Sequence, residues 1–279
     1  MPSLPDMMTQ DAEALAKAAG GTARAPGSAA EAALFERLLR LGDDALILGH
    51  RVSEWCGHAP TLEEDIALAN VALDLIGQAA LWLELAGEVE GAGRYADALA
   101  FRRDAGAFRN LLLVEQPNRD FGHTLMRQFL FDAWHHDLLA ALAGSSEPRI
   151  AAIAAKALKE AAYHLERSSD LVIGLGDGTK ESHQRMQAAL DRLWPYAGET
   201  FLPDAVDAAM AASGTAPDPA ALEAGWQARV ADVLAEARLQ IPEDNFRHKG
   251  GRQGVHSEHL GYLLAEMQFL QRAYPDAVW

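Results

Sequence analysis

The sequence predicts an all-α protein folded as a helical bundle. Apolar residues recur at three- and four-residue spacing along several long stretches, which is the periodicity of amphipathic helices. Short breaks rich in glycine and proline separate these stretches. No stretch alternates apolar and polar positions with an excess of β-branched and aromatic residues, so we predict no strands. Several long helices joined by short loops form a bundle.

The composition is that of a globular protein with a sizeable core. Of the 279 residues, 49% are hydrophobic and 23% are charged. The formal net charge of −16 argues against a nucleic acid partner, because phosphate binding needs a basic surface. No window approaches the ~18 uninterrupted apolar residues of a membrane helix, so we expect no membrane partner. The single cysteine, Cys56, is expected to be buried; it excludes an intrachain disulfide and favours a cytoplasmic location.

The first 30 residues differ from the rest of the chain. They are rich in alanine, glycine and proline and lack a repeat of large apolar residues. We predict that residues 1–30 form a mobile arm and that residues 31–279 form a single domain. The first helix begins near Leu34 and ends before Gly57 and Pro60. Its apolar positions are Leu34, Leu38, Leu41, Ala45, Leu48 and Val52.

A second helix is predicted from Thr61 to about Ala86. Thr61 and Glu64 have the spacing of a capping box, in which each side chain bonds the other residue's backbone N–H. The helix is apolar almost all round from Ile66 to Leu85. Such a helix belongs in the middle of a bundle, or at a surface that a partner covers.

Six further helices follow along the chain. They are predicted at residues 94–114, 120–143, 148–173, 182–200, 220–240 and 255–274. Glycine- and proline-rich segments at 174–178, 213–219 and 245–254 separate them. No change of composition demands a second domain.

Polar residues at interior positions are the features that could carry chemistry. Asn70, Asp74 and Gln78 are spaced four apart and form one stripe on the second helix. We predict that these side chains are buried and hydrogen-bonded, and that they fix the register between helices.

Carboxylates and histidines on facing helices also suggest a di-iron carboxylate site. Such bundles use a Glu from two helices and a Glu-x-x-His pair from two others. Asp132 and His135 have this spacing, whereas Glu160 and His164 are one residue too far apart and Tyr163 takes the ligand position. We therefore favour a structural role for these residues. A metal site remains the alternative, and its ligands would be Glu54, Asp132, His135, Glu160 and His164.

Two other polar groups have competing interpretations. Arg102, Arg103 and Arg109 would share a predicted helix with aromatic residues, which suits the phosphates and adenine of an acyl-CoA, or else they form an ordinary solvated face. His256 and His259 flank a helix start at which Ser257 is the expected cap, rather than a metal site.

Five segments of the chain resemble a known family, the C subunits of bacterial phenylacetyl-CoA epoxidase complexes. These segments are LGDD at 41–44, SEWCGHAP at 53–60, DIALAN at 65–70, NLLLVEQPN at 110–118 and HSEHLG at 256–261. The likeness extends in order from about Leu38 to Trp279.

The resemblance implies a ferritin-like helical bundle with additional C-terminal helices. It implies that this chain is a structural, non-catalytic subunit with no cofactor of its own. It also implies a homo- or hetero-oligomer with a catalytic A subunit, which holds the di-iron centre and adds one oxygen atom to the ring of phenylacetyl-CoA.

The resemblance further suggests a place where the CoA ester borders this chain, at the edge of the subunit interface. The residues are Ala107, Phe108, Arg109 and Asn110 in one segment and Ala208, Ala209 and Met210 in another. Two alternatives stay open: an oxygenase with its own di-iron site, and a helical acyl-CoA-binding or regulatory module that never joins an oxygenase.

Overall fold

The structure, a computed structural model, describes residues 27–243, 246–275 and 277. The helices in this part of the chain are α2 (Ala29–Ser53), α3 (Leu62–Glu90), α4 (Ala96–Phe101), η1 (Ala105–Ala107), α5 (Phe121–Leu142), α6 (Pro148–Gly176), α7 (Lys180–Ala197), η2 (Gly198–Phe201), α8 (Ala205–Ala212), α9 (Pro219–Glu236), η3 (Gly251–Gln253), α10 (Glu258–Met267) and α11 (Phe269–Ala273). The described residues form no strand, which confirms the all-α prediction. Most of the predicted N-terminal arm, residues 1–26, lies outside the described residues.

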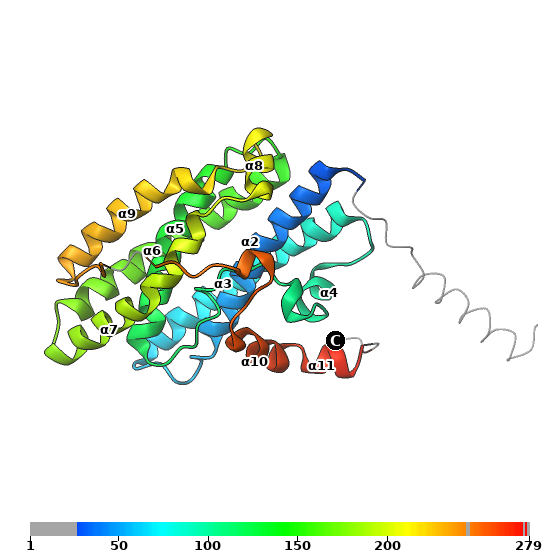
Figure 1. Cartoon of the computed structure of the whole chain (residues 1–279). Coiled ribbons are helices and arrows are strands. Elements are labelled where there is room, and N and C mark those ends of the chain that lie inside the picture. The colour runs from blue at the N-terminus through cyan, green and yellow to red at the C-terminus, as the bar shows by residue number, and fades with distance from the viewer. Residues whose placement is uncertain (1–26, 244–245, 276, 278–279) are drawn as a thin grey trace, which may run out of the picture.

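The long helices form a ferritin-like bundle with further helices around it. α2 packs against α3 and α5 packs against α6, and each pair is joined by a short connection that makes it antiparallel. Figure 1 shows α7 and α9 lying along α5 and α6, while α4, α10 and α11 gather beside the α2–α3 pair. This arrangement matches the predicted bundle with additional C-terminal helices.

The central helix is α2 rather than α3. Its residues from Arg37 to Gly49 are all buried, although four of them are charged. Arg37 and Arg40 bond Asp207 on α8, each at 3.1 Å, and so the charges are neutralised inside the fold. The prediction that α3 lies in the middle of the bundle is therefore wrong. Because its charges are paired, the less apolar helix α2 can occupy the middle of the bundle instead.

α3 leaves one apolar face exposed. Leu62, Ile66 and Leu73 are 72%, 55% and 67% exposed, while Leu75 and Trp82 on the opposite side are fully buried. Within the described residues, α3 alone is long and apolar enough to cross a membrane by length and composition, a test that helices of soluble proteins also pass. Only 44% of its most apolar window is buried inside the chain. This exposed face therefore fits the other prediction made for this helix, namely that it lies at a surface that a partner covers.

The predicted helix at 94–114 is wrong over most of its length. Only α4 and η1 are helical there, and residues 108–118 run through the interior without regular structure. Buried carboxylates take the place of helical hydrogen bonds: Asp43 accepts from the Arg109 N–H at 2.8 Å, and Asp44 accepts from the Leu111 N–H at 2.7 Å. A buried irregular segment is stable only when its backbone groups are satisfied in this way.

Several local predictions need smaller corrections. Cys56 is exposed rather than buried. Thr61 caps α3 by accepting from the Glu64 N–H, but the Glu64 carboxylate is bonded by Arg167 of α6 instead of completing the capping box. The helix predicted at 255–274 is divided into α10 and α11, and the Ser257 side chain makes no capping bond.

Candidate functional site

Polar side chains from α3 and α6 meet between the two helices. Gln78 donates to Glu160 at 2.9 Å, and His164 Nε2 lies 3.0 Å from Asp74 Oδ2. Because a carboxylate only accepts, the His164 ring proton is on Nε2. Gln78 and His164 are buried and Asp74 is half-buried, as the stripe predicted, whereas Asn70 is exposed and lies outside the cluster.

Asp132 and His135 add buried groups from α5. Asp132 accepts from Gln128 at 2.7 Å and from Ser168 at 2.9 Å. Burial raises the pKa of Asp132 to about 6, although His164 nearby opposes the shift. Burial and the neighbouring His164 lower the pKa of His135 to about 3, so His135 is neutral at physiological pH.

These residues do not fit a di-iron centre. Each carboxylate is engaged by an amide, hydroxyl or imidazole donor, and no three His, Cys, Asp or Glu side chains of the described residues gather so as to hold a metal. Glu54, a ligand in the alternative interpretation, is exposed at the end of α2, where it accepts from Arg51 and Asn118. The Nδ1 atoms of His135 and His164 are buried without a partner among the described residues.

The first segment predicted to border a CoA ester is largely internal. Phe108 is fully buried, and the Arg103 guanidinium lies 4.3 Å from the centre of its ring. Asn110 is also fully buried and donates to Glu115 at 3.0 Å. Ala107 is half-buried and its carbonyl accepts from Arg103 at 2.9 Å.

The arginines near this segment do not form one cationic face. Arg103 is paired with buried Asp43, and Arg109 is paired with Glu36 of α2 at 2.8 Å. Arg102 donates to the carbonyl of Pro275 at 2.7 Å. The hypothesis of three arginines on one helix fails because residues 102–109 do not continue the helix.

The second predicted segment lies on α8. Ala208 and Ala209 are exposed and Met210 is buried. Arg40 of α2 bonds Asp204, the N-cap residue of this helix, at 2.6 Å and Asp207 within the helix at 3.1 Å. The two segments thus both attach to the N-terminal half of α2, because Glu36 on that helix pairs with Arg109. Contact of either segment with a CoA ester stays a prediction.

A buried ionic cluster around Glu115 joins the internal segment to the C-terminal helices. Glu115 accepts from Asn110, from the Ser257 N–H at 2.6 Å and from His256 Nδ1 at 2.9 Å. His256 Nε2 lies 3.1 Å from the carbonyl of Phe108. Since both ring nitrogens face acceptors, these contacts favour the protonated form of His256.

Sequence reasoning missed this cluster and assigned His256 only to a helix start. Burial alone would lower the pKa of His256, but the hydrogen bond and charge of Glu115 outweigh burial and raise that pKa above its ordinary value. Glu115 and His256 are separated by 141 positions in the sequence, and no local pattern links them.

The chain matches a known protein family and a known protein. A family model described as "Phenylacetic acid catabolic protein" matches residues 19–279. The chain is also 50% identical over 241 residues to the C subunit of 1,2-phenylacetyl-CoA epoxidase from Escherichia coli (strain K12), a match that covers 86% of this chain and 97% of that protein.

Proposed function

Because the chain belongs to the phenylacetic acid catabolic protein family, we propose that it is the structural, non-catalytic subunit of a multicomponent phenylacetyl-CoA epoxidase. It pairs there with the di-iron catalytic subunit. The observation that carries this proposal is the 50% identity to an epoxidase C subunit along 97% of that subunit's length. The similarity to that subunit therefore covers the whole bundle and not only a fragment of it.

The polar cluster between α3, α5 and α6 supports the non-catalytic part of the proposal. Its carboxylates accept hydrogen bonds from Gln78, His164 and Ser168. Its buried polar groups are those expected of residues that fix helix register. The catalytic iron is then held by the partner, and this chain holds none.

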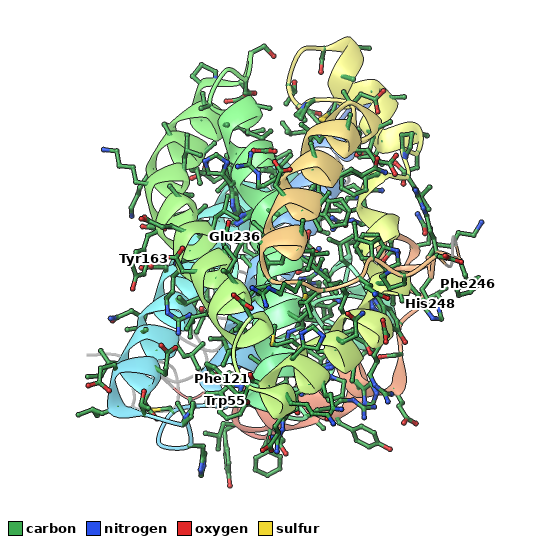
Figure 2. The ribbon with its side chains drawn as sticks, turned by 90° about the vertical axis from the view of Figure 1, so that its left-hand side faces the viewer. Trp55, Phe121, Tyr163, Glu236, Phe246 and His248 are labelled. Carbon is green, nitrogen blue, oxygen red and sulfur yellow. The ribbon has the colours of Figure 1, made fainter. Side chains whose placement is uncertain are left out.

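The exposed face of α3 supports the pairing part. Leu62, Ile66 and Leu73 are spaced four and seven residues apart, so they lie on one side of the helix. Tyr163 is half-exposed on the neighbouring α6, and Figure 2 shows it at the outer edge of the bundle. An exposed apolar helix face of this kind is typical of a protein interface. We refer to Leu62, Ile66, Leu73, Leu81 and Tyr163 as the α3 face.

The pairing is tested by charging the α3 face. Leu73→Glu leaves the isolated chain folded, because Leu73 contributes little to its core. In a complex the new carboxylate would be desolvated without a partner. We expect co-purification with the catalytic subunit to weaken at least tenfold, as measured by titrating the two purified subunits.

Leu270→Glu is the matched control. Leu270 is 47% exposed on α11, far along the chain from α3, and the substitution adds the same charge. It should leave the affinity unchanged. Loss of binding in Leu270→Glu together with full binding in Leu73→Glu would move the interface to the C-terminal helices and refute the role of the α3 face.

A further inference from the structure

A surface pocket lies where α5 begins beside α7. Its volume is about 580 Å³. Phe121, labelled at the lower end of the bundle in Figure 2, marks the first residue of α5 at this place. The pocket is lined by Arg119, Asp120, His123, Glu181, Gln184, Arg185, Ala188, Ala189 and Arg192. Three arginines in one pocket stand out in a chain whose net charge is −16.

Two of these arginines have no counter-charge within the part of the chain that the structure describes. Arg185 occupies both acidic residues of the pocket: it pairs with Glu181 at 2.6 Å and reaches Asp120 at 4.0 Å. Arg119 and Arg192 form no ion pair or hydrogen bond with any described residue through their side chains. The pocket thus presents two free guanidinium groups, which are well suited to phosphate oxygens.

His123 adds an unpartnered donor. The residue is only 4% exposed, yet its ring forms no hydrogen bond within the described part of the chain. Neither ring nitrogen of His123 is completely buried. Both therefore reach solvent through the pocket that His123 lines. Burial, with Arg127 and Arg119, lowers the pKa of His123 to about 4. The neutral ring therefore holds one N–H to donate.

The backbone also places Arg119 at this position. Its φ of 54° lies in the left-handed region, which is uncommon for a residue other than glycine. The residues on both sides are fixed: Asn118 donates to the carbonyl of Arg51, and Asp120 caps α5. The backbone of Arg119 is thus held at a turn that glycine would occupy more easily.

We propose that this pocket binds a small phosphate-bearing anion, whose phosphate oxygens are held by Arg119, Arg192 and the N–H of His123. The pocket volume is within the range of about 300–1,000 Å³ that is usual for small-molecule sites, so an organic part has room beside the phosphate. The proposal is independent of the pairing described above and applies equally to the free chain.

Isothermal titration of the full chain with inorganic pyrophosphate and with ADP tests it, at an ionic strength held constant with sodium chloride. Binding by either anion is expected, and the comparison shows whether the organic part contributes. Arg119→Gly removes one guanidinium and relieves the backbone, and Arg192→Gln removes the other. Each should weaken binding at least tenfold without lowering the thermal unfolding midpoint.

Arg238→Gly is the matched control, because Arg238 is the other described non-glycine residue with a positive φ, 57°. It lies beyond α9 and pairs with Asp177. Unchanged affinity in this variant supports the assignment. Absence of binding by both anions, or equal weakening in Arg238→Gly and Arg119→Gly, would overturn it.

Discussion

His256, just before α10, is held between two acceptors of the segment at residues 108–118 and helps to attach the C-terminal helices to that segment. Its two ring nitrogens bond the Glu115 carboxylate and the carbonyl of Phe108. The pKa of His256 is therefore above its unfolded value of about 6.5. A group of this kind stabilises the fold fully below the unfolded pKa, and the contribution is lost as the pH rises through the folded pKa.

Substitution of His256 should show this pH dependence. His256→Ala removes a charge-assisted hydrogen bond and should lower the free energy of unfolding by about 1.5–3 kcal/mol at pH 6. The difference from the parent chain should shrink as the pH is raised above about 6.5. Urea unfolding across this pH range measures it. Exposed His58→Ala is the control, and a His256→Ala effect that grows with pH would contradict the protonated state.

Single residues show where sequence reasoning reaches its limit. The stripe on α3 predicted that Asp74 and Gln78 take part in a buried network, and it failed at Asn70, whose place on the helix turns outward. The partners of charged residues could not be predicted at all. Arg40 and its partner Asp207 are 167 positions apart, and only the folded chain brings them together.

At the scale of elements, the irregular segment after α4 is attached to α2 by charge. Arg103 and the Arg109 N–H both bond Asp43, whose side chain is fully buried. Hydrophobic periodicity predicted a helix there because it registers apolar residues such as Phe108 and Leu111 but not the carboxylates that replace helical bonding. The local pattern and the tertiary contacts disagree here, and the tertiary contacts prevail.

Removal of the Asp43 carboxylate should therefore strongly destabilise the fold. Asp43→Ala leaves the Arg103 guanidinium buried without a counter-charge, which costs about 3–5 kcal/mol of unfolding free energy. The control is Glu88→Ala, which breaks the exposed pair of Glu88 with Arg149 and should cost less than about 1 kcal/mol. Chemical denaturation of both variants tests the comparison, and similar values for the two would show that the Asp43 pair does not hold the segment.

The positions of α2 and α3 within the bundle are likewise decided by tertiary contacts and not by local sequence pattern. Apolar composition alone placed α3 in the middle, but the middle belongs to α2, whose charged residues are neutralised by α8 and the internal segment. The surplus of apolar residues on α3 instead lies on its outer face. The sequence offered both alternatives for this helix, a central place and a covered surface, and could not decide between them.

For the whole molecule, the predicted class and the ferritin-like bundle are confirmed, and so is the likeness to epoxidase C subunits. The α3 face, the polar cluster between α3, α5 and α6 and the family together support the proposal that the bundle braces a partner. The pocket beside α5 and α7 has no part in this role. It could not be predicted from the sequence, because Arg119 precedes α5 whereas Arg185 and Arg192 lie on α7, distant along the chain.

We place the catalytic iron in the partner and not in this chain. Native mass spectrometry of the assembly, after co-expression with the di-iron subunit in iron-replete cells, tests this most directly. We expect a hetero-oligomer from which this chain is released free of iron, while the partner retains its metal. Release of this chain with about two bound iron atoms, lost in a His135→Ala variant, would contradict it.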